Sequence, residues 1–346
     1  MFFSNFNNKE NFNINNNFAN INNNNFNNNF NNKTKTIKDF YQTNKKFGRE
    51  LKNLNNLFFS FKNSVKKTEK KISFKENLKI FTENSPKKNN SNINEYLIDI
   101  LNDYKSNTKN FIISKNYMNN HLDINKKMRK ILINWLIEVH LKFKLKPNTL
   151  FLSINLIDNF LSKINNLNRK FLQLVGISSL LIASKYEEIF PPKTNDFIFI
   201  CDYAYNKNEL LHMENLILNS IDFNINFPTI FNFFEIYNQL FNFDKKIYFF
   251  CLFILELTLL EIDFLNYSSD EICSSAIYFS LKIFGFQKEK FENFCGFSYF
   301  MLKNCILDLA SLFDINKFNN IKTKSVYKKY SLPEFLEVAK IIKIEI

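Results

Sequence analysis

Ten stretches of helical periodicity follow one another between residues 126 and 313, with only short polar breaks between them. They form two sets of five on either side of Pro228: about 126–143, 149–163, 169–186, 194–202 and 207–221, then about 229–241, 245–260, 269–284, 288–295 and 298–313. In the second set, Asp244 and the "SSDE" at 268–271 are placed as N-caps. With only four glycines and six prolines in 346 residues, the pattern predicts an all-α fold. The equal helix counts suggest an internal duplication.

The composition changes sharply near residue 92. Residues 1–92 are rich in Asn and Phe and then in Lys, without sustained periodicity, which predicts a disordered tail. Seventeen Lys or Arg against six Asp or Glu give this tail a net charge of +11, out of +13 for the chain. Such a tail can attract nucleic acid or acidic partners, or it can be a solvated linker. We divide the chain into a regulatory tail (1–92), an N-terminal helix with the first helical set (93–227), the second set (228–316) and a C-terminal extension (317–346) that the sequence does not place.

Several classes of protein do not fit this composition. No N-terminal segment resembles a signal peptide, and the most apolar stretch, "IYFFCLFILELTLLEI", is interrupted by Glu256 and Glu261, so we expect a soluble intracellular protein without a membrane partner. The cysteines lack C-x-x-C spacing and sit mostly in apolar runs, which favours buried reduced thiols: Cys201, Cys251, Cys273, Cys295 and Cys305. The three histidines are scattered, and no phosphate loop or nucleophile elbow is present. We therefore expect no metal, no cofactor and no catalytic residues.

The stretch "MRKILINWLIEV", residues 128–139, holds the only tryptophan and is apolar on more than one side. At about 100° per residue, one apolar sector contains Met128, Ile131, Leu132, Trp135 and Val139. A second sector, roughly 130° away, contains Ile133, Leu136, Ile137 and His140. Such a helix is either central in its bundle or uses one sector as a docking groove.

Four motifs together resemble the first cyclin box of the mitotic A/B-type cyclins. They are "YMNNHLDI" at 117–124, "MRKILINWLIEV" at 128–139, "LQLVGISSLLIASKYEEIFPP" at 172–192 and "MENLILNSIDFNINFPT" at 213–229, in family order and at family spacing. The resemblance covers residue 93 to about residue 313, weakens in the second half and is absent from the tail. It implies two consecutive five-helix cyclin-box repeats that form a heterodimer with a cyclin-dependent protein kinase. Such a chain activates the kinase, positions its regulatory helix and recruits substrates in control of the cell cycle at G2/M, in nucleus and cytoplasm, without doing chemistry itself.

The resemblance also implies a kinase-binding surface. Lys185 and Glu214 match the residues that form a charged clasp on the mobile regulatory helix of the kinase. The apolar residues around them are Ile182, Tyr186, Leu218, Phe223 and Ile225, and Tyr96 and Ile100 fall where the N-terminal helix of the family touches the kinase. An unpaired charge beside buried surface is costly. The competing interpretation is a solvated ion pair that contributes under about 1 kcal/mol.

The resemblance gives the tryptophan sector a second role, as a shallow groove for Arg-x-Leu segments of substrates or inhibitors. Its floor consists of Met128, Ile131, Leu132 and Trp135, with Glu138 beside it for the cation of the peptide and Arg169 and Gln173 at its polar rim. An aromatic floor with an adjacent carboxylate suits a Leu anchor and an Arg head group. Arg129 matches a family arginine that supports this helix from within, and we interpret it as structural.

Short signals occur in the tail. The triplet "KEN" matches a recognition motif of the ubiquitin ligase of mitotic exit and occurs twice, at Lys9, Glu10 and Asn11 and at Lys75, Glu76 and Asn77. In a chain so rich in Lys and Asn, chance matches are also expected. "SPKK" at 85–88 fits a proline-directed kinase, which makes Ser85 a candidate phosphosite or another chance match.

Two other classes carry cyclin boxes: transcription-type cyclins and general transcription factors of the IIB type, which bind polymerase components or DNA. A factor of the IIB type has an N-terminal zinc ribbon, which this chain cannot form because no cysteine precedes Cys201. Nucleic acid is therefore not an expected partner. "YMNNHLDI" and "SKYEEIFPP" resemble the mitotic group more than the transcription-type cyclins.

Overall fold

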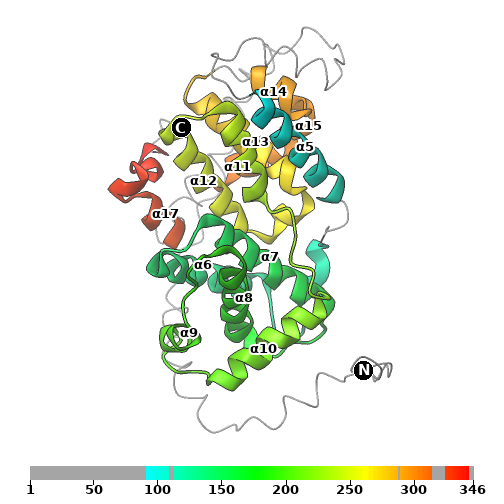
Figure 1. Ribbon diagram of the computed structural model, residues 1–346, viewed down its shortest axis with the longest axis vertical. Helices are drawn as coiled ribbons and strands as arrows, with labels where there is room; N and C mark the ends of the chain where they lie inside the picture. The colour runs from blue at the N-terminus through cyan, green and yellow to red at the C-terminus, as the bar shows by residue number, and fades with distance from the viewer. Residues whose placement is uncertain (1–90, 109–112, 287–288, 314–323, 343–346) are drawn as a thin grey trace, which may run out of the picture. The chain divides into compact units, whose positions relative to one another are not determined.

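The computed structural model describes residues 91–108, 113–286, 289–313 and 324–342, which all belong to one compact unit, Ser60–Ile346. The first helices are α5 (Ser91–Thr108), α6 (Lys126–Phe143), α7 (Pro147–Lys163), α8 (Leu172–Glu187), α9 (Thr194–Ile200) and α10 (Lys207–Ser220). They are followed by α11 (Ile230–Phe241), α12 (Lys245–Leu259), α13 (Ser269–Ile283), α14 (Glu289–Cys295), α15 (Tyr299–Leu312) and α17 (Ser325–Tyr330) (Figure 1). Short 3-10 helices lie at Lys115–Asn120, Arg169–Phe171, Ile262–Asn266, Pro333–Phe335 and Val338–Ile342. Within the described ranges there is no strand, so the predicted all-α fold with two five-helix repeats is confirmed.

Local capping explains where several helices begin. Asp244 accepts a hydrogen bond from the backbone N–H of Lys246 at the start of α12, and Ser268 accepts one from the N–H of Glu271 at the start of α13. Both N-caps were predicted, because a short polar side chain before an apolar run satisfies N–H groups that have no partner inside the helix. The 3-10 helix Arg169–Phe171 begins where a continuous α-helix was expected, and α8 starts only at Leu172.

The first repeat packs around α8, which contacts α6, α7, α9 and α10. Every residue from Leu172 to Ser184 except Gln173 is buried, so this helix is apolar on all sides and needs neighbours all round it. Gly176 permits a close approach, because a Cβ atom at this position would lie 2.7 Å from Cδ1 of Leu132 on α6. The core of the first repeat therefore fixes α8 relative to α6.

The second repeat is built around α12 and α13, which pack on each other and on α11 and α15. Its core is strongly aromatic: Phe233, Phe234, Tyr237, Phe250, Phe253, Phe291 and Phe294 are almost completely buried. The N-terminal helix α5 packs on α11 of this repeat, and its Leu97, Ile98 and Leu101 join the same core (Figure 1). Although α5 precedes the first repeat in sequence, it therefore packs on the second.

Arg129 joins the two repeats. Its guanidinium is buried and forms a two-pronged pair with Asp158, at 2.7 Å from Nε and 2.6 Å from Nη2, while Nη1 donates to the carbonyl of Leu259 at 3.0 Å. Tyr117 donates a further hydrogen bond to Asp158 at 2.6 Å. Arg129 thus has the structural position that was expected for it, and its main partner is the carboxylate of Asp158.

The C-terminal segment 324–342, which the sequence did not place, packs on both repeats. The backbone N–H of Ser325 donates to the side chain of Asn134 on α6 at 2.9 Å. Five residues later, Tyr330 donates to Glu256 in the middle of α12 at 2.8 Å, and Lys329 pairs with the same carboxylate at 2.5 Å. Lys329 and Glu256 are both buried. This segment is thus a further connection between the repeats.

Two further expectations are tested by the described residues. All five cysteines are buried and reduced, as predicted. Burial raises the pKa of the Cys251 thiol to about 12, so it stays protonated and unreactive in the folded chain. Among the described helices, none combines the length and the apolar character that a membrane-spanning helix requires.

Candidate functional site

Lys185 and Glu214 form an ion pair on the surface of the first repeat. Lys185 is in the last turn of α8 and Glu214 is on α10, and Nζ of the lysine lies 2.6 Å from Oε1 of the glutamate. The lysine side chain is 45% exposed and the glutamate side chain 13%. In the free chain, each charge therefore compensates the other and both remain accessible from one side. An exposed pair of this kind contributes little to stability.

The residues after Lys185 are held by their own hydrogen bonds. The carboxylate of Glu188 accepts from the backbone N–H of Lys146 at 2.7 Å and from the hydroxyl of Thr149 at 2.5 Å, at the start of α7. Lys146 Nζ donates to the carbonyl of Glu187 at 2.9 Å. Tyr186, which lies between these anchored residues and the ion pair, is exposed. The segment thus presents an aromatic ring from a fixed backbone.

A strained turn at the end of α10 presents a second aromatic ring. Asp222 and Phe223 both have left-handed backbone conformations, with φ of 53° and 56°. The N–H of Phe223 donates to the carbonyl of Leu218 at 2.9 Å, and its ring is exposed. A bulky residue with positive φ is unfavourable and persists only where the surroundings impose it. Leu218 and Ile225 on either side are half-buried.

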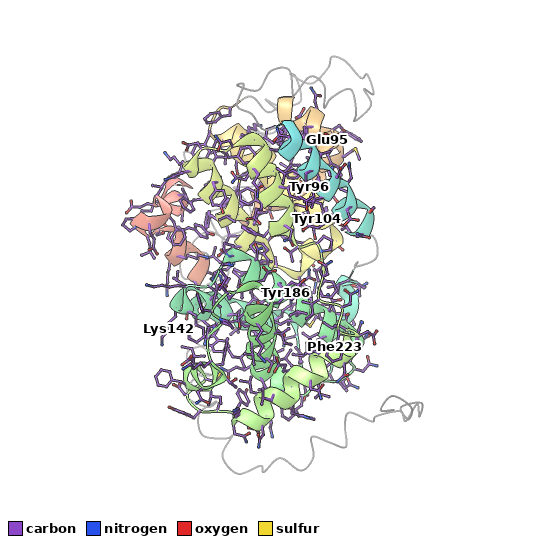
Figure 2. The ribbon with its side chains drawn as sticks, viewed as in Figure 1. Glu95, Tyr96, Tyr104, Lys142, Tyr186 and Phe223 are labelled. Carbon is purple, nitrogen blue, oxygen red and sulfur yellow. The ribbon has the colours of Figure 1, made fainter. Side chains whose placement is uncertain are left out.

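The N-terminal helix α5 contributes Tyr96, which is 67% exposed, and Ile100, which is half-buried against the core of the second repeat. Tyr104 lies on the same helix, and its ring meets Phe233 edge-on at 5.8 Å. Burial and the nearby charges of Glu235, Asp103 and Glu187 raise the pKa of Tyr104, and Tyr186 adds a further small contribution. Figure 2 labels Tyr96, Tyr104, Tyr186 and Phe223.

We call the set of Lys185, Glu214, Tyr186, Phe223 and Tyr96 the clasp surface. The structure differs from the sequence-based assignment at Ile182, which is only 3% exposed and lies in the core of the first repeat. It also adds two residues that the sequence reasoning missed, Ile189 (77% exposed) and Phe190 (91% exposed). Their signal was an apolar pair in a short segment between two glutamates and two prolines, where no core face exists to bury it.

The tryptophan sector of α6 is partly open, as one of the two interpretations of the sequence expected. Ile131 is exposed and Met128 and Trp135 are half-buried, whereas Leu132 is buried beneath them against Gly176. The second sector, with Ile133, Leu136, Ile137 and His140, is fully buried in the core. One face of α6 therefore packs in the bundle while the other reaches the surface.

The polar residues assigned to the rim of this groove lie on two different elements. Arg169 is exposed in the 3-10 helix before α8, and Gln173 is half-buried in the first turn of α8. Glu138 on α6 accepts a hydrogen bond from the hydroxyl of Ser325 at 2.5 Å. The C-terminal segment thus reaches the carboxylate that was assigned to the cation of a peptide. The candidate signals Lys9–Asn11, Lys75–Asn77 and Ser85 lie outside the described residues.

The rest of the described chain does not gather reactive groups. Within it, no three His, Cys, Asp or Glu side chains lie close enough together to hold a metal ion. His121 and His140 are buried. Nε2 of His121 donates to the carbonyl of Leu161 while its Nδ1 accepts from the backbone N–H of Leu167, and Nε2 of His140 donates to the carbonyl of Lys146. The surface presents exposed apolar side chains around the Lys185–Glu214 pair. It also presents the open part of the tryptophan sector on α6. These are features of a helical docking protein.

Family models match both repeats. The cyclin N-terminal domain matches residues 99–226, and the cyclin C-terminal domain matches residues 228–343. The chain belongs to the cyclin family, as its sequence motifs predicted.

Its relatives are mitotic cyclins. Cyclin-B2-4 of Arabidopsis thaliana is 38% identical over 258 residues, which cover 74% of this chain and 59% of that protein. Cyclin-B2-2 of Oryza sativa subsp. indica is 42% identical over 184 residues, 53% of this chain and 44% of the relative. The G2/mitotic-specific cyclin-1 of Medicago sativa subsp. varia is 36% identical and covers 71% of this chain and 58% of its own length. The matched region thus spans less than two thirds of these relatives, whose names favour the mitotic group over transcription-type cyclins.

Solved structures share the fold. A viral cyclin from herpesvirus saimiri aligns with a TM-score of 0.55 at 17% identity, covering 61% of this chain and 95% of the viral protein. A chain of the yeast RNA polymerase II CTD kinase complex CTDK-1 aligns with a TM-score of 0.51 at 16% identity, covering 67% of this chain and 82% of its own length. At such low identity these similarities concern the architecture alone.

Proposed function

We propose that this chain is a regulatory subunit that binds and activates a cyclin-dependent protein kinase in control of the G2/M transition. The observation that carries the proposal is the clasp surface, where an accessible Lys185–Glu214 pair is accompanied by the exposed rings of Tyr186 and Phe223. Exposed aromatic residues next to charged groups are typical of protein interfaces. The kinase supplies the catalytic residues, and the complex works in nucleus and cytoplasm.

In the free chain, the pair leaves neither of its two charges uncompensated. Lys185 and Glu214 satisfy each other, so neither charge is left alone beside the apolar core. When a partner helix approaches, the lysine offers donors and the glutamate offers acceptors at 2.6 Å from each other, a pattern that fits a segment with both donors and acceptors. Ile189 and Phe190 extend the apolar part of this surface.

A charge swap tests the proposal. The double variant Lys185→Glu with Glu214→Lys keeps an internal ion pair and therefore the fold, but it reverses the pattern that faces the partner. We expect kinase activation to be lost while the thermal unfolding midpoint stays within a few degrees of wild type. The matched control is the swap Lys126→Glu with Asp263→Lys, an exposed pair at 3.1 Å that is not part of the clasp surface. Full activation by the Lys185/Glu214 swap, at normal yield of complex, would refute this role of the clasp surface.

We also propose that the open sector of α6 is a docking groove for Arg-x-Leu segments. It is supported by the half-buried Trp135 and Met128 next to the exposed Ile131, with the Glu138 carboxylate one turn further on. An aromatic residue that anchors a ligand in a desolvated pocket often contributes roughly 2 kcal/mol or more to binding. We therefore expect Trp135→Ala to weaken Arg-x-Leu peptides by about thirtyfold or more.

The same substitution distinguishes a groove from a core. If Trp135 acts only in the core, its removal costs roughly 3–5 kcal/mol of stability and abolishes docking and activation together. Ile131→Ala and Met128→Ala are the controls, because both residues are accessible and should impair docking with little effect on unfolding. Leu132→Ala is not a suitable control, since Leu132 is buried. A large stability loss without a selective docking defect would contradict the groove.

The tail carries a separate proposal, that one of the "KEN" triplets recruits the ubiquitin ligase of mitotic exit and that Ser85 is phosphorylated by the bound kinase. Deleting residues 1–92 should then lengthen the half-life of the protein through mitotic exit without changing kinase activation in vitro. Substituting Glu10 and Glu76 one at a time identifies the triplet that is used. An unchanged half-life would show that both triplets are chance matches in a chain rich in Lys and Asn.

The identity of the partner that co-purifies with the chain distinguishes the proposal from the alternative, a transcription-type cyclin. A mitotic proline-directed kinase that co-purifies and phosphorylates a histone-type substrate supports the proposal. Recovery of polymerase components, or binding to bare DNA, would favour the alternative.

A further inference from the structure

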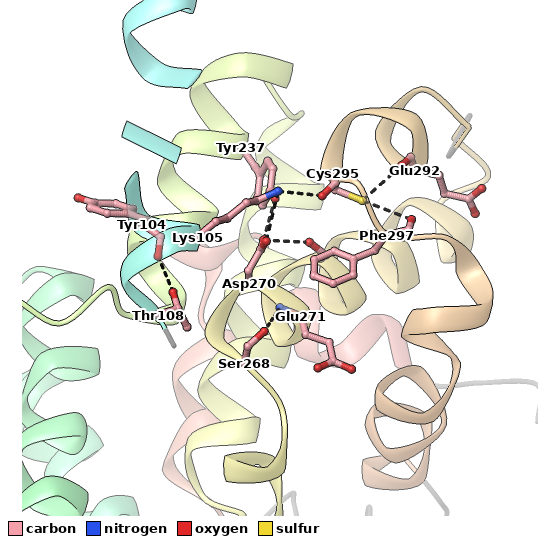
Figure 3. Close-up of polar contacts among 11 residues, drawn as sticks. Tyr104, Lys105, Thr108, Tyr237, Ser268, Asp270, Glu271, Glu292, Cys295 and Phe297 are labelled. Carbon is pink, nitrogen blue, oxygen red and sulfur yellow. Dashed lines mark hydrogen bonds and ion pairs between the residues drawn. The ribbon is translucent and has the colours of Figure 1, made fainter. Parts of the chain in front are cut away.

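Lys105, in the last turn of α5, ties this helix to two elements of the second repeat. Its Nζ atom lies 3.3 Å from Oδ2 of Asp270, at the start of α13, and donates to the carbonyl of Cys295 at 2.9 Å, at the end of α14 (Figure 3). The ring of Phe297 is 5.9 Å from the same nitrogen. Lys105 and Asp270 are 165 residues apart in sequence, so this contact exists only in the folded chain.

The carboxylate of Asp270 is built into the core. Only 7% of its side chain is exposed, compared with 26% for Lys105. Tyr237 on α11 donates a hydrogen bond to Oδ1 at 2.7 Å, and Ser274 donates to the same atom at 3.3 Å. Burial raises the pKa of Asp270, while Lys105 and Tyr237 lower it. Residues from three helices of the second repeat, α11, α13 and α14, therefore surround the amino group of Lys105.

Tyr96 of the clasp surface lies on the opposite side of α5. It precedes Lys105 by nine residues, which corresponds to a rotation of about 180° and a rise of roughly 13 Å along the helix. Leu97 and Leu101 lie between these two directions, Ile98 lies about 20° beyond that of Lys105, and all three are buried. A rotation of α5 that loosens Lys105 therefore moves Tyr96 by a similar arc.

The apolar face of α5 does not by itself fix that rotation. Burial of Leu97, Ile98 and Leu101 is favourable over a range of helix rotations and axial shifts, because the hydrophobic effect is not directional. Hydrogen bonds are directional and weaken steeply as the geometry departs from linearity. Lys105 donates to a backbone carbonyl and pairs with a carboxylate that is itself held by Tyr237, so only a narrow range of positions satisfies all of them.

We infer that Lys105 is the positioning residue of α5: held by Asp270 and the Cys295 carbonyl, it fixes the rotation and axial register of the helix and so places Tyr96 for contact with the kinase. This inference rests on the proposed function, because it assigns Tyr96 to the interface. It gives the second repeat a part in kinase binding that is exerted through α5.

The test uses the full chain and a recombinant mitotic cyclin-dependent kinase, with the dissociation constant measured by titration of kinase activity. Lys105→Met keeps most of the length of the side chain but removes its charge and its donors, and we expect it to raise the dissociation constant by about tenfold. Lys105→Arg retains a cation and donors and should restore most of the affinity. Lys126→Met, which removes an exposed lysine on α6, should leave the affinity unchanged.

A double-mutant cycle with Tyr96→Ala separates positioning from general stability. If Lys105 acts by placing Tyr96, then Lys105→Met should add less than about twofold to the dissociation constant once Tyr96 is absent. A purely structural role would give the same loss in both backgrounds. Because Lys105→Met leaves Asp270 buried with one partner fewer, the variant Lys105→Met with Asp270→Asn serves as a second test. It removes the buried charge, should fold normally and should show the same loss of affinity.

The inference is overturned if Lys105→Met binds the kinase as tightly as wild type, or if its effect is the same with and without Tyr96. Failure of the proposed function gives a different pattern. In that case the Lys185/Glu214 swap also leaves kinase binding unchanged, whereas a failure of the inference alone leaves the swap defective and the Lys105 variants normal.

Discussion

Gly176 is where α8 approaches α6 most closely, and Gly176→Ala tests whether that approach shapes the candidate groove. A Cβ atom at this position would lie 2.7 Å from Cδ1 of Leu132 and 3.1 Å from its Cγ and Cδ2. Favourable carbon–carbon contacts lie at about 3.5–4.0 Å. The leucine side chain must therefore move by roughly half an ångström or more, and its Cγ contact means that rotating the methyl groups alone does not relieve the overlap.

Two opposing terms set the expected effect on stability. Overpacking a well-filled core costs about 1–3 kcal/mol. Alanine in a helix interior is favoured over glycine by about 1 kcal/mol, which offsets part of this cost. The net change is a loss of about 0–2 kcal/mol, so the variant should fold. Leu132 lies three residues before Trp135 on the same face of α6, so its displacement changes the floor of the groove.

The assay compares three quantities for Gly176→Ala: the free energy of unfolding in urea, the affinity for an Arg-x-Leu peptide and the affinity for the kinase. We expect peptide affinity to fall severalfold while kinase affinity stays near wild type, because the clasp surface lies at the far end of α8. Ser179→Ala is the matched control, since Ser179 is a fully buried residue of the same helix whose hydroxyl has no hydrogen-bond partner. A Gly176→Ala variant that is more stable than wild type, with unchanged peptide affinity, would refute the reasoning.

Two further predictions concern buried charges. Burial and the nearby charge of Lys329 lower the pKa of His140 to about 3, so the folded chain binds fewer protons than the unfolded chain below pH about 6.5 and loses stability as the pH falls. Between pH 7 and 5.5 this amounts to about 1.3 kcal/mol, and urea unfolding of His140→Gln should lack that part of the pH dependence; equal losses in both proteins would contradict it. Lys329→Met leaves Glu256 buried without its cation and should cost about 3–5 kcal/mol. Calorimetry should show that adding Glu256→Gln recovers much of that loss, and an unaltered midpoint in Lys329→Met would argue against the pair.

Local patterns made much of the fold predictable. The N-caps Asp244 and Ser268 were found because capping depends on residues next to the helix. The two apolar sectors of α6 were found because the helical repeat fixes which residues share a face, and the structure buries one sector while leaving part of the other open. The short 3-10 helices Lys115–Asn120 and Ile262–Asn266 were missed, since five or six residues do not establish a period.

The candidate site was predictable only where a family motif named its residues. Lys185 and Glu214 were named in this way, and the structure brings them to 2.6 Å. Ile182 was named with them although it is buried, because the motif gives residue type and spacing but not exposure. Phe190 was missed for the converse reason: its exposure depends on how the segment after α8 is held, through the bonds of Glu188 to α7. Lys105 could not be found at all, because its partner is remote in sequence.

The contacts that join distant parts of this chain share a physical character. Arg129 reaches from α6 to Leu259, Lys329 from the C-terminal segment to Glu256, and Lys105 from α5 to Asp270. Apolar residues of similar volume in place of a buried ion pair often give equal or greater stability, so stability alone does not account for them. Apolar contact is not directional and restricts the register of packed helices less sharply than a charged donor with fixed acceptors does. The proposed interface draws its exposed residues from α5, α8 and α10, and it requires that register because these residues must contact one partner at the same time.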